Sequence, residues 1–165
     1  MTKKSFQYIY GPVYSWRLGM SLGVDPISHP QKVCNFNCLY CQLGENCFFQ
    51  SKRKVFISAK AIVEEIKQVP PKNIDHITFS GCGEPTLAKN LGTMIRAIKR
   101  VRKEKIAVIT NSSLIYRRDV QADLMLSDFV LAKLDAATDE SFAMISRGID
   151  TVSLDQMVKA LCTFR

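Results

Sequence analysis

Short apolar runs that alternate with segments of helical periodicity constrain the fold of this chain most strongly. Three such runs, at residues 76–80, 106–110 and 129–134, are short, largely apolar and contain many β-branched and aromatic residues. Strands that are apolar at almost every position are typical of a parallel sheet covered by helices, and right-handed crossovers then set its winding. An earlier strand around residues 21–26 completes the pattern. The sequence therefore predicts an α/β fold that resembles a barrel.

The segments between these runs are expected to be helices. Residues 59–69 carry apolar side chains three and four apart, with Ser58 as a cap and Pro70 as a stop. Residues 91–101 show the same spacing, and weaker helices are expected at 118–126, 140–145 and 154–164. No repeat or linker divides the 165 residues. We therefore expect residues 1–165 to form a single domain with a sizeable core.

Polar side chains stand directly after each predicted strand. In a parallel sheet the loops that follow the strands emerge at the same edge, where α/β proteins place their sites. The four loops are thus expected to converge on one rim. The residues concerned are Cys34, Cys38 and Cys41 after the first strand, Gly81, Cys82, Gly83 and Glu84 after the second, Asn111, Ser112 and Ser113 after the third, and Asp135 after the fourth.

The spacing Cys34-x-x-x-Cys38-x-x-Cys41 points to a metal centre. Three thiolates within eight residues can hold three irons of a four-iron cluster and leave the fourth iron without a protein ligand. Structural zinc usually needs four ligands in two pairs, and the chain has no second pair. Its histidines, His29 and His76, follow no ligand spacing.

Two functions other than cofactor chemistry stay open at this point. A non-catalytic iron–sulfur electron carrier needs a fourth thiolate. Cys47, Cys82 and Cys162 are the candidates, and none continues a ferredoxin spacing, but Cys47 or Cys82 could complete the ligand set. A zinc-stabilised RNA-binding module would use the basic surface instead. The formal net charge is +8, concentrated at residues 52–54, 99–105 and 117–118. Solvated helix faces explain such clusters as readily as a phosphate-binding surface does.

The motif Cys-x-x-x-Cys-x-aromatic-Cys, with Tyr40 at the aromatic position, resembles the radical S-adenosylmethionine (radical SAM) superfamily. Residues 11–13, 17–19, 21–25 and 80–87 extend the resemblance, which runs from about Gly11 to the last residue. These segments are similar to the branch related to the tRNA wyosine-synthesis enzymes and to uncharacterised iron–sulfur oxidoreductases. The resemblance implies a parallel (βα)6 barrel, of which this chain would supply about four βα units.

It also implies the cofactors, a [4Fe-4S] cluster on Cys34, Cys38 and Cys41 and S-adenosylmethionine on the open iron. The reduced cluster would cleave the sulfonium to a 5'-deoxyadenosyl radical, with electrons from a donor of the flavodoxin or ferredoxin type. The cofactor carries this chemistry, so no substrate acid or base is named. The residues expected to bind the cofactor are Tyr40, Ser80, Gly81, Gly83, Glu84, Asn111, Lys133 and Asp135.

Individual roles follow for some of these residues. By resemblance, Gly81, Gly83 and Glu84 form the glycine-glycine-glutamate motif that receives the methionyl ammonium. Lys133 shares a strand face with Asp135 and is expected to meet either that carboxylate or the cofactor's carboxylate. Tyr40 is expected to pack its ring in the core, with its backbone toward the adenine.

The start of the chain lacks an apolar signal region, and no stretch approaches the roughly 18 apolar residues of a membrane span. A cytoplasmic enzyme is expected, in a compartment where six cysteines stay reduced. Four strands where the superfamily has six predict that the chain is truncated at its C-terminus, or pairs as a homo-oligomer or with a missing C-terminal segment. RNA is one candidate substrate.

Overall fold

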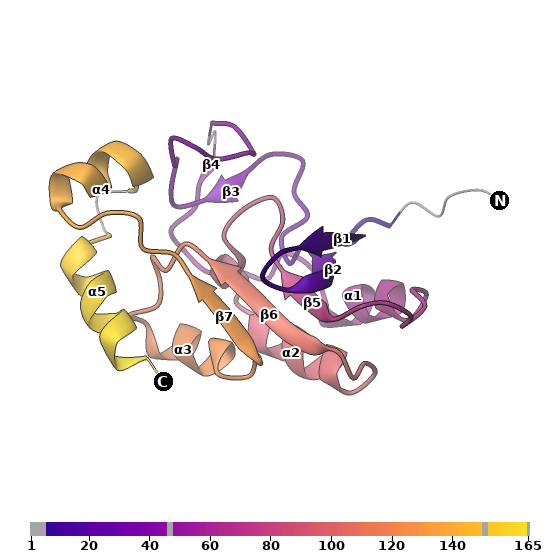
Figure 1. Cartoon of the computed structure of the whole chain (residues 1–165). Helices are drawn as coiled ribbons and strands as arrows, with labels where there is room; N and C mark the ends of the chain where they lie inside the picture. The colour runs from indigo at the N-terminus through magenta and orange to yellow at the C-terminus, as the bar shows by residue number, and fades with distance from the viewer. Residues whose placement is uncertain (1–5, 46–47, 150–151, 165) are drawn as a thin grey trace.

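A central sheet of five strands organises the protein, in the order β1-β2-β5-β6-β7 (Figure 1). The computed structural model describes residues 6–45, 48–149 and 152–164. The strands are β1 (Ile9–Ser15), β2 (Gly19–Val24), β5 (His76–Phe79), β6 (Lys105–Thr110) and β7 (Phe129–Ala132). β2, β5, β6 and β7 run parallel, and β1 pairs antiparallel with β2. The four predicted parallel strands are confirmed, whereas β1 was not predicted.

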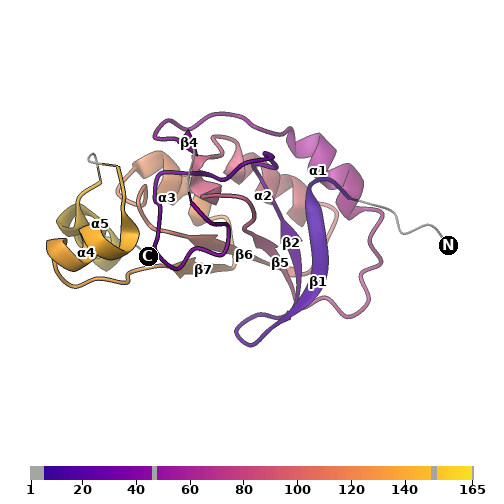
Figure 2. The same cartoon turned by 90° about the horizontal axis from the view of Figure 1, so that it is seen from above.

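Three helices cover one face of this sheet, as Figure 2 shows from above. They are α1 (Ala59–Ile66), α2 (Leu91–Lys99) and α3 (Arg118–Leu124). Ser58 caps α1 by accepting a hydrogen bond from Ala61 N at 3.2 Å, as predicted. Fully buried side chains of the strands, such as Ile77 and Phe79, pack with those of the helices, such as Ile62, in one core. The helical periodicity thus correctly predicted which side of these helices packs against the sheet.

Two further helices, α4 (Asp139–Ser146) and α5 (Leu154–Thr163), lie beyond β7 at one end of the sheet (Figure 1). They pack against the loop that carries the cysteines in a second apolar cluster. The rings of Phe36 and Phe142 meet edge to face in it, with centroids 5.5 Å apart. Leu39 N also donates to Ile145 O at 2.9 Å. The cysteine loop therefore rests on α4.

The remaining short elements shape the loops near the ends of the parallel strands. β3 (Val33–Cys34) and β4 (Phe48–Phe49) form a small parallel sheet, and η1 (Pro85–Leu87) is a 3-10 turn after β5. Neither was predicted. In the described part of the chain no strand pairs with the outer edge of β7. No helix of the described residues is long and apolar enough to span a membrane.

Candidate functional site

A cavity of about 800 Å³ opens where the parallel strands end. It is lined by the three cysteines and by the eight residues that the sequence predicted to bind the cofactor. These are Cys34, Cys38 and Cys41, with Tyr40, Ser80, Gly81, Gly83, Glu84, Asn111, Lys133 and Asp135. The predicted convergence of four loops on one rim is confirmed. Ser112 and Ser113 are fully buried and are not part of the lining that the structure describes.

The strand register explains why these loops meet. Val24 at the end of β2 pairs with Phe79 at the end of β5, and Thr110 at the end of β6 pairs with Ala132 at the end of β7. The chain leaves each strand at a similar height, so the following residues face a common space. The site is thus a product of sheet topology.

Hydrogen-bond donors point at two of the three cysteine sulfurs. The sulfur of the buried residue Cys34 accepts hydrogen bonds from Phe36 N at 3.4 Å and from Asn111 Nδ2 at 3.5 Å. Lys133 Nζ lies 3.0 Å from Cys38 Sγ. Burial, together with the nearby Glu84 carboxyl group, raises the pKa of the Cys34 thiol to about 12. This thiol keeps its proton at neutral pH until a metal displaces it.

The donor set fits an iron–sulfur cluster better than a single ion. Among the described residues no three His, Cys, Asp or Glu side chains lie close enough to hold one metal ion. The zinc interpretation therefore gains no support. In a four-iron cluster each thiolate binds a different iron, so three sulfurs around one cavity are suitable ligands without converging on a point. N–H donors aimed at the sulfurs stabilise such thiolates.

Glu84 ties together the elements around the cavity. Its Oε1 accepts hydrogen bonds from Thr86 N at 3.0 Å, Thr86 Oγ1 at 2.6 Å and Thr110 Oγ1 at 2.6 Å, while Oε2 accepts Asn111 N at 2.7 Å. Burial raises the pKa of Glu84, although these hydrogen bonds work in the opposite direction. Oε2 has capacity for a further donor, since a carboxylate oxygen can accept two.

The two glycines beside Glu84 allow close backbone approach. A Cβ on Gly83 would lie 1.8 Å from Val33 O, in the strand that leads into the cysteines. Gly81 has a φ of +130°, and a Cβ there would meet Asp25. Gly83 therefore lets the loop after β5 approach the cysteine strand, and Gly81 lets the same loop approach Asp25 after β2, in addition to any contact with a ligand.

Cys82 turns away from the cavity. Its sulfur accepts a hydrogen bond from His29 N at 3.2 Å, and its N–H donates to Asp25 Oδ2 at 2.9 Å. It is not among the described residues that line the cavity, so its position does not support a fourth cluster ligand. Cys47, the other candidate for that role, lies outside the described residues.

Asn111 connects the end of β6 to the cysteine loop. Its Nδ2 donates to Asn35 Oδ1 at 2.9 Å as well as to Cys34, and Asn35 Nδ2 donates to Ser113 Oγ at 2.6 Å. Asn35 is fully buried. The amide of Asn111 thus orients the cysteine loop, a role that the sequence pattern did not indicate.

Lys133, Asp135 and Tyr40 form a second polar network in the lining of the cavity. Lys133 Nζ lies 3.0 Å from Asp135 Oδ2, so the structure shows the first of its two expected partners. Tyr40 donates its hydroxyl to the same oxygen. Its side chain is exposed, so the prediction that its ring packs in the core is wrong. Burial, then the hydrogen bond to Asp135, raises the pKa of Tyr40 to about 12.

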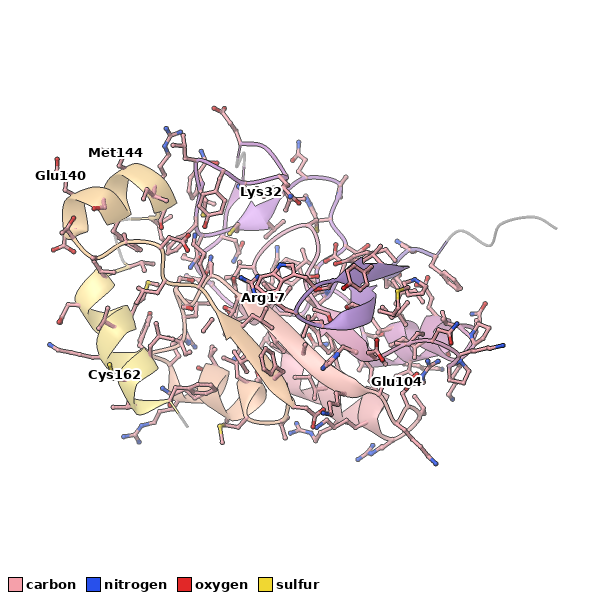
Figure 3. All side chains as sticks on the ribbon, in the orientation of Figure 1. Arg17, Lys32, Glu104, Glu140, Met144 and Cys162 are labelled. Atoms are coloured by element: carbon pink, nitrogen blue, oxygen red, sulfur yellow. The ribbon has the colours of Figure 1, made fainter. Side chains whose placement is uncertain are left out.

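Two basic residues in the lining had no predicted role. Arg17, in the turn of the β1–β2 hairpin, has its guanidinium 4.0 Å from the ring centroid of Trp16. Lys32 is buried beside β3 and donates to Gly44 O at 3.0 Å. Both side chains are labelled in Figure 3. Arg17 lies within one of the segments that carried the family resemblance, which was the available signal.

Comparison with known proteins identifies the family to which this chain is related. The model of the Radical SAM superfamily matches residues 28–164. A UPF0026 protein of Synechocystis sp. is 42% identical over 98% of this chain and 60% of its own length. A UPF0026 protein of Methanocaldococcus jannaschii is 37% identical over 94% of this chain and 49% of its own. A protein named probable GTP 3',8-cyclase from Saccharolobus islandicus is 28% identical over 78% and 39%.

The chain spans about half the length of the curated relatives it matches. The family match nevertheless covers most of the chain, including the cysteine loop and all four parallel-strand loops except the start of the first. It confirms the superfamily that the cysteine motif predicted, and the largely parallel α/β sheet agrees with part of a barrel of that type. The chain belongs to the Radical SAM superfamily.

Proposed function

We propose that this chain, alone or as the cluster-bearing part of a longer enzyme, holds a [4Fe-4S] cluster on Cys34, Cys38 and Cys41 and binds S-adenosylmethionine beside it. Members of the superfamily generally bind these two cofactors. One observation carries the proposal: the three cysteines and the eight residues predicted to bind the cofactor line a single cavity.

When bound, a reduced cluster supplies one electron to the sulfonium, which yields methionine and a 5'-deoxyadenosyl radical. The chain's own residues bind and orient. Glu84 Oε2 offers its remaining lone pair to the methionyl ammonium, a charge-assisted contact. Asp135 and the hydroxyl of Tyr40 supply further polar groups in the lining. Placing these groups in advance lowers the entropy cost of bringing cofactor and substrate together.

The apolar part of the lining supports a role in holding the substrate of the radical. Ile109, Phe129 and Leu131 come from β6 and β7 and alternate with Val108 and Val130, which pack in the core with the helices. Ile109 and Phe129 are exposed. Small-molecule sites are lined mainly by apolar and aromatic side chains, with a few polar groups that fix the orientation of the ligand.

An external electron donor of low potential, of the flavodoxin or ferredoxin type, is part of the proposal. RNA as the substrate has less support. Several members of the basic clusters are engaged in ion pairs, among them Lys99 with Asp128 at 2.8 Å and Arg117 with Asp119 at 2.9 Å. Charges neutralised in this way contribute little to phosphate binding.

Anaerobic reconstitution with iron and sulfide tests the proposal. We expect a reduced cluster whose paramagnetic resonance spectrum changes when S-adenosylmethionine is added, and formation of 5'-deoxyadenosine. Cys38→Ala should lose the cluster, whereas Cys162→Ala, at an exposed thiol on α5, should keep it. A protein with a full complement of cluster whose spectrum does not change when S-adenosylmethionine is added would contradict the proposal. Loss of the cluster in Cys82→Ala would favour the electron carrier.

A further inference from the structure

We propose that Lys133 is a positioning residue that raises the reduction potential of the cluster through a hydrogen bond to the Cys38 sulfur. The inference rests on the proposed function, because it concerns a ligand of that cluster. Lys133 follows β7 directly and lies 95 residues from Cys38 in the sequence, yet its Nζ is 3.0 Å from Cys38 Sγ. The sheet topology, not the local sequence, creates this contact.

The ammonium of Lys133 is held in this position from several sides. Asp135 Oδ2 lies 3.0 Å from Nζ, and Tyr40 donates its hydroxyl to that same oxygen. The ring centroids of Phe36 and Tyr40 lie 5.3 and 5.0 Å from Nζ. Only 20% of the lysine side chain is exposed. A charge fixed in a partly dry environment acts on its neighbours more strongly than one that moves in water.

The direction of the effect follows from charge. Reduction of the cluster adds one electron, which the external donor supplies, and the added negative charge spreads over the sulfurs. Hydrogen bonds to those sulfurs are among the features that set the potential of iron–sulfur clusters. The contact to Cys38 is both charged and shorter than the 3.4 Å and 3.5 Å contacts that neutral N–H groups make to Cys34. Lys133 therefore stabilises the reduced state.

A different role for Lys133, binding the cofactor's carboxylate, makes a different prediction. An ammonium has three N–H bonds, of which Cys38 and Asp135 take two. A lysine that served the carboxylate would change the affinity for S-adenosylmethionine. A lysine that acts on Cys38 changes a potential measured in the absence of S-adenosylmethionine.

The test compares midpoint potentials from redox titrations monitored by paramagnetic resonance on the reconstituted full chain without S-adenosylmethionine. We expect Lys133→Met to shift the potential to more negative values. Lys133→Arg, which keeps a charged donor, should stay close to the wild type. Lys60→Met is the matched control, because it removes the same charge from an exposed side chain on α1 that pairs with Glu64 at 3.9 Å. Its potential should not move.

Equal potentials for the wild type and Lys133→Met would overturn the inference while leaving the proposed function intact. Weaker binding of S-adenosylmethionine at unchanged potential would do the same and assign Lys133 to the carboxylate. If Lys133→Met takes up no cluster, Lys133→Gln decides. It retains a neutral donor and should lie below the wild-type potential, and equality with the wild type would overturn the inference. A wild type that assembles no cluster would defeat both proposals.

Discussion

Glu84 donates its backbone N–H to the carbonyl oxygen of Val33 at 3.1 Å, one residue before the first cysteine of the motif. Val33 N in turn donates to Cys82 O at 3.0 Å. The glycine loop after β5 and the strand that enters the cysteine loop are therefore joined by reciprocal backbone bonds. A change in either segment is transmitted to the other.

Gly83→Ala should destabilise the protein, because the new Cβ would lie 1.8 Å from Val33 O. A steric conflict with backbone costs about 2 kcal/mol or more, and urea unfolding of the metal-free chain under reducing conditions measures it. Gly44→Ala is the control, since its Cβ would meet no atom within 4 Å. It incurs only the cost of a φ of +75°, about 1 kcal/mol. Equal stability of Gly83→Ala and the wild type would contradict this contact.

Glu84 should make stability depend on pH. Its pKa in the folded protein is raised above the 4.5 of an unperturbed carboxyl group, so the folded state binds its proton more tightly. The free energy of unfolding should then fall as pH rises above 4.5, by at most about 1.4 kcal/mol per pH unit. Glu84→Gln should abolish this component, whereas Glu64→Gln, at an exposed site on α1, should leave it unchanged. A wild-type curve that rises relative to Glu84→Gln over this range would contradict the prediction.

Asn111→Asp should weaken the metal centre. The substitution replaces the amide that donates to Asn35 Oδ1 and Cys34 Sγ by an acceptor, and so places negative charge against both. Loss of a hydrogen bond that orients a metal ligand typically costs about tenfold or more in metal affinity. Iron bound per chain after reconstitution at limiting iron measures the effect. Asn73→Asp, the same change at an exposed residue, should bind iron as the wild type does.

Arg53→Met should be among the more damaging substitutions distant from the cysteines. The side chain of Arg53 is 4% exposed, and its guanidinium pairs with Asp119 at 2.7 Å and with Asp123 and donates to Thr86 O at 2.8 Å. Removing it leaves Asp123, whose side chain is 17% exposed, and the buried carbonyl of Thr86 without this partner, at a cost of about 3 kcal/mol or more. Arg117→Met removes an ion pair to the same Asp119 from a side chain that is 39% exposed, so it should cost about 1 kcal/mol or less. Similar unfolding midpoints for the two variants would contradict this difference.

The sequence was informative where one physical pattern dominates. Apolar runs located β5, β6 and β7, and helical periodicity located α1 to α5, because burial determines those elements. β2 was expected because the alternating pattern needed an earlier strand. β1 escaped prediction because six of its seven residues are not buried and carry no alternating pattern. The position of the site at one edge of the sheet could be predicted because the strands are parallel, so the loops that follow them emerge at the same edge.

Partners within the site could not be predicted in the same way. Glu84 meets Asn111 across 27 residues, and Lys133 meets Cys38 across 95. Periodicity describes neighbours on one element and contains no information on which polar groups face each other in a loop. The exposure of Tyr40 was missed for that reason, as its hydroxyl pairs with Asp135 instead of its ring packing inward.

The dependence of the cysteine loop on α4 has a consequence for biosynthesis. Asn37 N donates to Ser146 O at 3.1 Å, so the support of the loop is completed only when α4 has formed. Ribosomes add roughly 5–20 residues per second, which places the end of this helix several seconds behind the thiols. The thiols of a nascent chain are thus synthesised before the helix that supports their loop.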